Sequence, residues 1–284
     1  MLWRIAAFLS VAVSCSAFSG RQTFLPQRWT TMSSSTGLYA ELQAILWDMD
    51  GVLADTERDG HRLAFNQAFQ ENNLQTEWDV ERYGVLLEVG GGKERMTAHW
   101  NEVGWPANLS EESRQEKVKE LHLRKTDIFM DMINEGRIPL RPGVLRVIDA
   151  AIAENIRLAV CSTSNEKAVT NLVQTLMGPE RAAQFRIFAG DMVQRKKPAP
   201  DVYNMAVEQM GLDKSRCVIV EDSGIGLKAA LAAGIPCIVT KSSYTAGEDF
   251  TGAAMIVDEL GDDPRTGVTL ETLAGLLVAG SPSS

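Results

Sequence analysis

The sequence has no excess of positive charge with which to bind a polyanion. Its 284 residues carry 28 lysines and arginines against 37 aspartates and glutamates, a net charge of −9 at pH 7. Nucleic acids and anionic membranes bind basic patches, so we expect neither as a partner of the mature protein. Any phosphate site must therefore be local and built from a few cations and backbone N–H groups.

The four cysteines and three histidines also lack the spacings of metal sites and redox pairs. The sequence contains no CxxC, HxxxH or HExxH, which argues against a zinc site. We expect buried, reduced thiols, and the absence of a cysteine framework favours a reducing compartment. The length and a hydrophobic content of 45% allow one or two globular domains, and we expect a monomer.

The first forty residues contain no acidic side chain. Arg4 precedes a short apolar run, too short to cross a bilayer, which ends in small residues; this predicts a signal peptide over 1–17. Residues 18–40 combine two arginines with many serines and threonines, the composition of a transit peptide. The two segments, with Phe18 at their junction, resemble the bipartite plastid presequences of diatoms and related algae. A secreted protein with a disordered leader is the alternative.

From residue 42 onward, short apolar runs alternate with helical patterns. Continuous hydrophobic runs are typical of strands covered on both faces, so we predict an α/β fold with a doubly wound, Rossmann-like parallel sheet. Residues 60–73 and 110–136 are amphipathic at helical spacing. We therefore expect a small helical domain over 58–138, inserted into a core of 41–57 and 139–284. The predicted strands are Gln43–Trp47, Arg157–Cys161, Arg186–Phe188, Cys217–Val220, Cys237–Thr240 and Met255–Val257.

Polar side chains follow the predicted strands at the edge where parallel sheets bind ligands. Four carboxylates at one edge would repel one another without a cation, and hard oxygen ligands favour Mg²⁺. For Ser164 and Asn165, a helix N-cap is an alternative role. The residues at this edge are Asp48, Asp50, Ser162, Thr163, Ser164, Asn165, Lys197, Glu221 and Asp222.

Four motifs stand in a fixed order at these positions: DMDGV, VCSTS, the lysine of KKPAP, and VEDS. In this they resemble the haloacid dehalogenase-like hydrolases, and the resemblance covers the chain from about residue 43 onward. Dehalogenases of this superfamily generally lack the second aspartate of the first motif. Because Asp50 is present, the resemblance implies phosphate chemistry rather than dehalogenation.

The resemblance also implies a role for each motif residue. Asp48 would be the nucleophile that forms an aspartyl-phosphate, and Asp50 the general acid and base. Ser162 and Lys197 would hold the phosphoryl oxygens. The implied Mg²⁺ ligands are Asp48, the backbone carbonyl of Asp50, Glu221 and Asp222.

Longer stretches narrow the resemblance to one group of these hydrolases. DTERDGHRLAFNQAF, WDVERYGVLLEVGGGKERM, LRPGV and AVCSTSNEKAV look like the CbbY-type xylulose-1,5-bisphosphate phosphatases, in the plastid form found with Rubisco. That group removes the 1-phosphate of xylulose 1,5-bisphosphate, an inhibitory Rubisco by-product, to give xylulose 5-phosphate. The resemblance implies this reaction, a functional link to Rubisco, and the plastid stroma. Val52 replaces a threonine common in the superfamily, and Asp55 replaces a glutamate of some bacterial members.

A bisphosphate substrate requires a second anion site, which we expect in the inserted domain. The GGGKER stretch combines glycine N–H groups with two cations. A glycine-rich helix start with solvated charges is the alternative interpretation. The candidate substrate contacts are Asp55, His61, Gly91, Gly92, Lys93, Glu94, Arg95, His122, Lys125, Arg141, Ser162, Thr163, Ser164, Asn165 and Lys167.

Three other functions fit parts of the sequence. A β-phosphoglucomutase-like isomerase would share the core and the cap class, but its cap loop lacks the GGKER pattern. A broader sugar-phosphate phosphatase would use the same motif residues. A catalytically idle assembly factor near Rubisco is expected to have lost a carboxylate, and none is lost here. These features favour the bisphosphatase.

Overall fold

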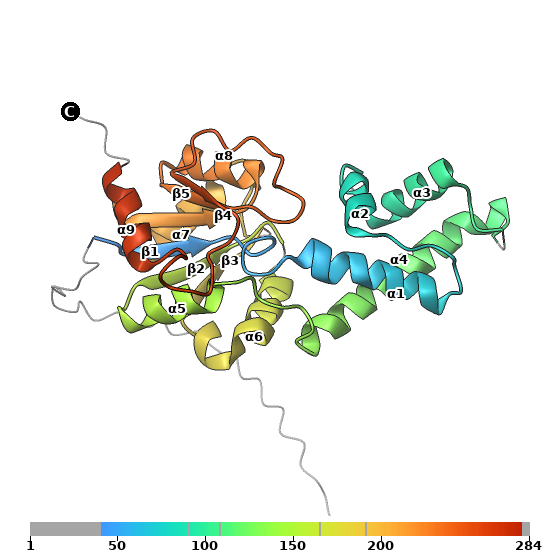
Figure 1. The fold of residues 1–284 in the computed structure, drawn as a ribbon, viewed down its shortest axis with the longest axis horizontal. Helices are drawn as coiled ribbons and strands as arrows, with labels where there is room; N and C mark the ends of the chain where they lie inside the picture. The colour runs from blue at the N-terminus through green and yellow to red at the C-terminus, as the bar shows by residue number, and fades with distance from the viewer. Residues whose placement is uncertain (1–40, 90, 108, 165, 191, 280–284) are drawn as a thin grey trace, which may run out of the picture. The chain divides into compact units, whose positions relative to one another are not determined.

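The computed structural model describes residues 41–89, 91–107, 109–164, 166–190 and 192–279, so the predicted presequence lies outside the described residues. A six-stranded parallel sheet of order β3-β2-β1-β4-β5-β6 forms its centre (Figure 1). The predicted α/β class is confirmed, and one end of β1, β3 and β4 differs by one residue from the prediction. The strands are β1 (Ala44–Trp47), β2 (Arg157–Cys161), β3 (Phe185–Phe188), β4 (Cys217–Glu221), β5 (Cys237–Thr240) and β6 (Met255–Val257).

Helices cover both faces of the sheet because successive strand residues point to opposite sides. Ile45 and Trp47 belong to the hydrophobic layer beneath α5, α6 and α9, whereas Ala44 and Leu46 belong to the layer beneath α7 and α8. All four residues of β1 are buried, which explains the continuous apolar run. The helices of this part are α5 (Val144–Ala153), α6 (Glu166–Ala182), α7 (Asp201–Met210), η3 (Lys214–Arg216), α8 (Gly224–Ala233) and α9 (Leu270–Ala279).

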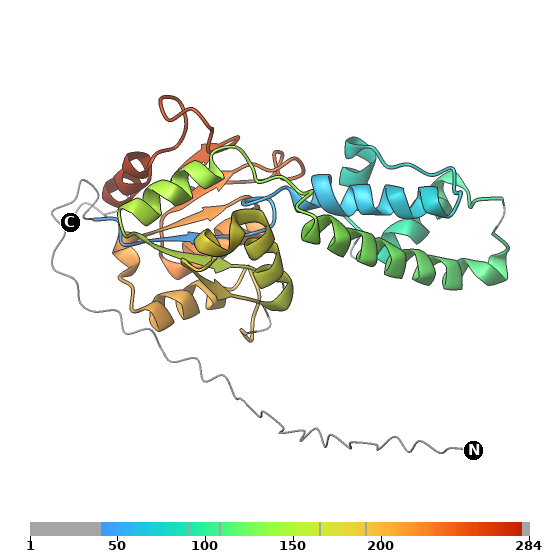
Figure 2. The same cartoon turned by 90° about the horizontal axis from the view of Figure 1, so that it is seen from below.

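Between β1 and α5 the chain is helical, and we call residues 57–134 the cap. Helix α1 buries Ala64, Phe65, Ala68 and Phe69, one apolar face, and packs along α4 (Figures 1 and 2). The division into an insert of 58–138 and a core remains a prediction. The cap elements are η1 (Glu57–His61), α1 (Arg62–Glu71), α2 (Val80–Leu86), α3 (Gly92–Val103), η2 (Glu111–Ser113) and α4 (Arg114–Asn134).

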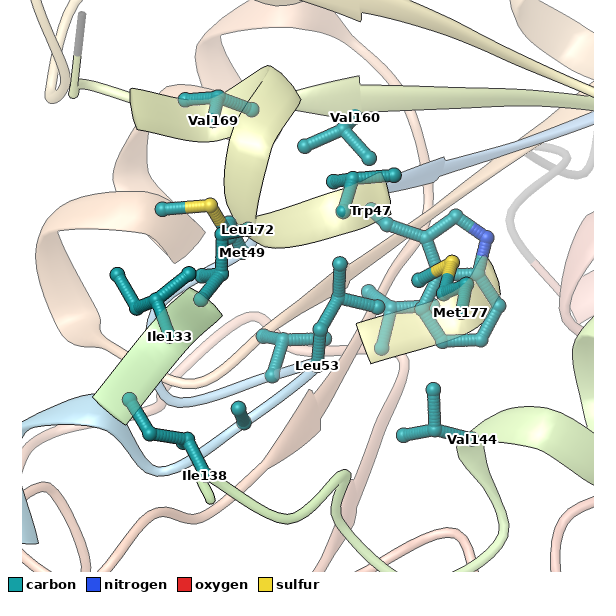
Figure 3. Close-up of a cluster of buried hydrophobic side chains, with 14 of the residues drawn as sticks. Trp47, Met49, Leu53, Ile133, Ile138, Val144, Val160, Val169, Leu172 and Met177 are labelled. Atoms are coloured by element: carbon teal, nitrogen blue, oxygen red, sulfur yellow. The ribbon is translucent and has the colours of Figure 1, made fainter. Parts of the chain in front are cut away.

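A hydrophobic cluster joins the end of the cap to the sheet (Figure 3). Ile133 of α4 and Ile138 of the following linker are buried in the same cluster as Trp47 of β1, Leu53 and Leu172 of α6. Burial of such side chains contributes roughly 1.5–3 kcal/mol each. The point at which the chain returns from the cap is therefore fixed by packing against β1 and its loop.

The described cysteines are buried and unpaired, as expected. Burial raises the pKa of Cys161, Cys217 and Cys237, so these thiols stay protonated at neutral pH. Among the described helices, none has the length and apolar character needed to cross a bilayer.

Candidate active site

The ends of β1 and β4 bring three carboxylates together. The two strands pair directly, with Trp47 opposite Val220, so that Asp48 emerges beside Glu221 and Asp222. One oxygen from each of these three carboxylates lies within 4.8 Å of the others. All three residues have little exposed surface, and Glu221 is completely inaccessible to solvent. Sheet pairing alone therefore creates a site of concentrated negative charge.

Lys197 is the cation within this cluster. Its Nζ lies 2.5 Å from Asp48 Oδ1 and 2.7 Å from Glu221 Oε1. Burial lowers the pKa of Lys197, but the two carboxylates outweigh burial and raise it above the usual range, so the lysine stays charged. Burial raises the pKa of Asp48; Lys197 opposes the rise, and the neighbouring carboxylates add to it. One ammonium does not compensate three buried carboxylates.

Two hydroxyl groups orient Asp50. Thr56 Oγ1 donates to Oδ1 at 2.6 Å, and Ser164 Oγ donates to Oδ2 at 3.3 Å. Burial raises the pKa of Asp50, and this outweighs the two hydrogen bonds and the charge of Lys197, which lower it. A raised pKa suits a carboxyl group that first gives and then accepts a proton.

These groups open into a cavity of about 530 Å³ between the strand ends and the cap. Among the described residues that line it, Lys197 is the one cation, against eight carboxylates. An anionic ligand would be repelled from such a lining unless a cation were bound there. The eight acidic residues are Asp48, Asp50, Asp55, Glu57, Glu88, Glu221, Asp222 and Glu248.

The carboxylate donor set fits a divalent cation that prefers oxygen. Burial and the charge of Glu221 raise the pKa of Asp222 to about 7, against a hydrogen bond from Ser242 and the charges of Lys197 and Arg141. A cation bound among Asp48, Glu221 and Asp222 would favour the charged form of Asp222 and so oppose this rise in pKa. The cluster therefore has both the ligand type and the unbalanced charge of a metal site.

Two of the cap cations predicted to hold a second phosphate, Arg95 and Lys125, lie near Glu57. Glu57 itself lines the cavity. Tyr83 Oη donates to Glu57 Oε2 at 2.7 Å, and Arg95 Nη1 donates to Tyr83 Oη at 3.2 Å. Lys125 Nζ lies 2.8 Å from His61 Nδ1. Burial lowers the pKa of Lys125 to about 8, although the charge of Glu57 raises it. Arg95 thus lies 3.9 Å from Glu57, and Lys125, which contacts His61, is close enough to Glu57 for the two charges to interact.

None of the predicted contacts from His61 to Lys125, and neither Arg95 nor Lys125 among them, lines the described cavity. Lys93 and Glu94 are exposed in the first turn of α3, which begins at Gly92. A Cβ at Gly92 would lie 2.8 Å from His122 Cδ2, so those two positions are neighbours. Lys167 is exposed near the start of α6. For Gly91, Gly92, Lys93, Glu94, His122 and Lys167 a substrate contact stays a prediction, and the helix-start interpretation describes the stretch well.

The loop after β2 places hydroxyl groups beside Asp50 and in the lining of the cavity. Ser162 is buried, and its Oγ accepts a hydrogen bond from the Ser164 N–H at 3.1 Å. Thr163 lines the cavity. Asn165 lies outside the described residues. The hydroxyl of Ser164 donates to Asp50, so this loop contacts the carboxyl group that follows β1. For Ser164 and Asn165 both the substrate contact and the helix-cap alternative stay predictions.

Residues 42–234 match the model of the haloacid dehalogenase-like hydrolase family. The chain belongs to this family. A CBBY-like protein from Arabidopsis thaliana is 53% identical over 249 residues, which span 87% of this chain and 78% of that protein. The plasmid-encoded CbbY protein of Cupriavidus necator is 41% identical over 226 residues, spanning 78% of this chain and 87% of that protein.

A solved structure of this haloacid dehalogenase-like group is similar throughout most of its length. It is a mutant of CbbY from Rhodobacter sphaeroides in complex with xylulose 1,5-bisphosphate, with a TM-score of 0.59, 40% identity, and coverage of 77% of this chain and 94% of that chain. These matches confirm the predicted family and the predicted enzyme class, a phosphatase.

Two predicted substrate contacts of the hydrolase, Asp55 and Arg141, form hydrogen bonds with its own backbone, and for both a substrate contact stays a prediction. Asp55 accepts hydrogen bonds from the N–H groups of Ser243 at 3.1 Å and Arg58 at 3.3 Å, although it also lines the cavity. Arg141 does not line the cavity, and its guanidinium donates to four backbone carbonyls. Its acceptors are the carbonyls of Gly51, Thr240, Lys241 and Asp258 and the hydroxyl of Thr240.

Sequence reasoning missed the loop after β5 of the hydrolase. Ser242, Tyr244 and Thr245 line the cavity, and Tyr244 also contacts the cap, since a Cβ at Gly84 would lie 3.2 Å from its Cδ1. The rule that parallel strands end at one edge could have found this loop, because β5 was predicted with the correct end. The cap positions Gly84 and Leu87 also line the cavity and carry no comparable signal in the sequence.

Gly51 of the hydrolase lies in a tight turn against Asp222, so a side chain at this position should disturb the site. Its φ is +78°, and a Cβ at this position would overlap the Asp222 carboxylate. We expect Gly51→Ala to lower kcat by at least about a hundredfold, because the methyl group displaces a carboxylate of the cluster. Steady-state phosphate release measures the effect. Gly234→Ala is the control, because its φ is +72° and no atom lies within 4 Å of the added Cβ; equal losses in the two variants would contradict the prediction.

Proposed function

We propose that the protein is a Mg²⁺-dependent phosphatase that removes the 1-phosphate of xylulose 1,5-bisphosphate, giving xylulose 5-phosphate and inorganic phosphate. The observation that carries the proposal is one cavity lined by both Asp48 and Asp50, with Lys197 Nζ 2.5 Å from Asp48 Oδ1. Support for the substrate comes from the CbbY structure that holds this bisphosphate.

The chemistry proceeds in two displacements at phosphorus. Asp48 attacks the phosphorus, the bond from phosphorus to the sugar oxygen breaks, and Asp50 donates its proton to that oxygen. Asp50, now a carboxylate, then takes a proton from a water molecule, which attacks the aspartyl-phosphate and releases phosphate from Asp48. Lys197 and Ser162 stabilise the charge on the phosphoryl oxygens in both steps.

The excess of carboxylates in the cavity lining supports the proposal of a bound Mg²⁺. Asp48, Glu221, Asp222 and the backbone carbonyl of Asp50 would hold Mg²⁺. The bound ion would act as a Lewis acid toward the phosphoryl group and would offset the carboxylates that otherwise repel an anionic substrate.

We propose that the cap holds the second phosphate through Arg95, Lys125 and His61. The side chain of Arg95 is 15% exposed and lies 3.9 Å from Glu57, and Lys125 contacts His61 behind the same glutamate. A phosphate entering beside Glu57 would meet two partly desolvated cations, where charge-assisted hydrogen bonds are strong. Of the two cations predicted from the GGGKER stretch, Lys93 and Arg95, we therefore favour Arg95.

The substrate prediction is tested by phosphate release from the purified protein with Mg²⁺. We expect rapid loss of one phosphate from xylulose 1,5-bisphosphate and at least about a hundredfold lower kcat/KM for ribulose 1,5-bisphosphate, glucose 1-phosphate and phosphoglycolate. Equal or faster turnover of a monophosphate would overturn the bisphosphate assignment. Conversion of a sugar phosphate to its isomer without free phosphate would instead establish the mutase-like alternative.

We propose that the mature enzyme acts in the plastid stroma, where its substrate arises beside Rubisco. The composition of residues 1–40 and the similarity to a plant protein support this compartment. A monomer and the bipartite presequence remain predictions.

A further inference from the structure

Tyr203 is a buried phenol that the two displacements at phosphorus do not use. It lies on α7, is completely inaccessible to solvent, and its Oη donates to Glu221 Oε1 at 2.5 Å. Glu221 is equally buried, so its charge must be compensated by internal donors. The phenol is therefore placed against the least accessible charge of the active site.

Three donors converge on the Glu221 carboxylate. Oε1 accepts from Tyr203 and also lies 2.7 Å from Lys197 Nζ, while Oε2 accepts from the Asp222 N–H at 3.2 Å. Gly226 of α8 makes this packing possible, because a Cβ at that position would overlap the carboxylate. Each oxygen of Glu221 thus has a donor from the protein, and Oε1 has two.

Tyr203 also contacts Lys197 directly. The Lys197 Nζ lies 5.0 Å from the centre of the Tyr203 ring, within the range of a cation–π interaction. Both residues come from one short segment, since α7 begins at Asp201, four positions after the lysine. The ring of Tyr203 therefore limits the position of the Lys197 ammonium, and its hydroxyl limits the position of Glu221, which pairs with that ammonium.

We propose that Tyr203 is a positioning residue for phosphoryl transfer that acts through Glu221 and Lys197; this rests on the proposed phosphatase function. Lys197 is shared between Asp48 Oδ1 and Glu221 Oε1. The phenol supplies Glu221 with a second donor, which leaves the ammonium available to the nucleophile. Without the hydroxyl, Glu221 Oε1 depends on Lys197 alone and draws it away from Asp48 and from the phosphoryl oxygens.

Tyr203→Phe removes the hydroxyl and keeps the ring. We expect kcat to fall by roughly tenfold with KM changed less than about twofold, because the lost hydrogen bond to a charged group acts on the chemical step. The substrate is whichever phosphate ester the wild-type enzyme hydrolyses fastest, p-nitrophenyl phosphate included. A failure of the bisphosphate assignment therefore leaves this test intact.

Thr269→Val is the matched control, since its hydroxyl pairs with Thr272 at the start of α9 and does not contact the site. It should lose stability while keeping the wild-type kcat. A Tyr203→Phe enzyme with wild-type kcat would overturn the proposal, as would a loss carried by KM or one no larger than that of the control.

A second measurement uses stability and does not depend on activity. Unfolding free energies of Tyr203→Phe, Glu221→Met and the double variant form a double-mutant cycle. We expect clearly non-additive effects, because methionine has no carboxylate oxygen to accept the hydrogen bond of the phenol. Additive effects would show that Tyr203 does not act through Glu221 and would overturn the proposal.

Discussion

Asp48→Asn should reduce phosphate release by at least about four orders of magnitude, because an amide cannot displace an alkoxide from phosphorus. We expect neither Asp50 nor Glu221 to replace it as the nucleophile. Asp50 is held by hydrogen bonds from Thr56 and Ser164, and Glu221 is held by Tyr203 and Lys197. The variant should fold, because the amide oxygen can still accept a hydrogen bond from Lys197. Phosphate release under Mg²⁺ saturation measures the loss.

Mass spectrometry of the quenched reaction provides the second measurement. Wild-type enzyme should carry phosphate on Asp48 during turnover, and the variant should carry none. Asp149→Asn is the matched control, since Asp149 pairs with Arg181 at the exposed surface, and it should keep wild-type activity. Residual activity of Asp48→Asn within about tenfold of wild type would show that another group attacks phosphorus.

Arg141→Met should have the largest effect on stability, lowering the free energy of unfolding by about 3 kcal/mol. The guanidinium joins the loop after β1 to the loops after β5 and β6 through carbonyls of Gly51, Lys241 and Asp258. Methionine fills the space of the stem but leaves these acceptors unpaired. Because Gly51 lies between Asp50 and the cap, we also expect kcat to fall by roughly tenfold. Urea denaturation and steady-state kinetics measure the two effects.

Arg146→Met is the control that separates the expected fall in kcat from the expected loss of stability. Arg146 likewise donates to backbone carbonyls, those of Leu260, Gly261 and Val268, and has no hydrogen bond to the loop after β1. It should lose comparable stability and keep the wild-type kcat. If both variants kept kcat, Arg141 would stabilise the fold without shaping the site. Arg141→Lys should recover little, since one ammonium cannot reproduce the fork.

The motif residues could be predicted from the sequence because burial and topology determine where they lie. A continuous apolar run such as β1 must be covered on both faces, and its first polar residue, Asp48, then falls at the edge where β4 also ends. The sequence predicts that Asp48, Glu221 and Asp222 share this edge, whereas the pairing of β1 with β4 that makes them neighbours comes from the structure.

The role of Arg141 could not be predicted in this way. One of its acceptors, the carbonyl of Asp258, lies 117 positions later in the chain, and no local pattern records such a contact. The GGGKER stretch shows a related difficulty. Its residues form the start of α3, and Arg95 turns toward Val89 and Tyr83 while Lys93 is exposed. Side-chain direction on a short helix depends on packing rather than on composition.

The order of the strands has a consequence for how the protein is made. β1 is the first strand of the chain but lies between β2 and β4 in the sheet. Roughly 170 residues separate β1 from β4, so a ribosome adding about 5–20 residues per second needs about 10–35 s to supply the missing neighbour. The cap, whose α1 and α4 contact each other, is complete earlier. A nascent chain that has not reached Asp222 has Asp48 without its partner carboxylates, so we expect it to be inert toward phosphate esters.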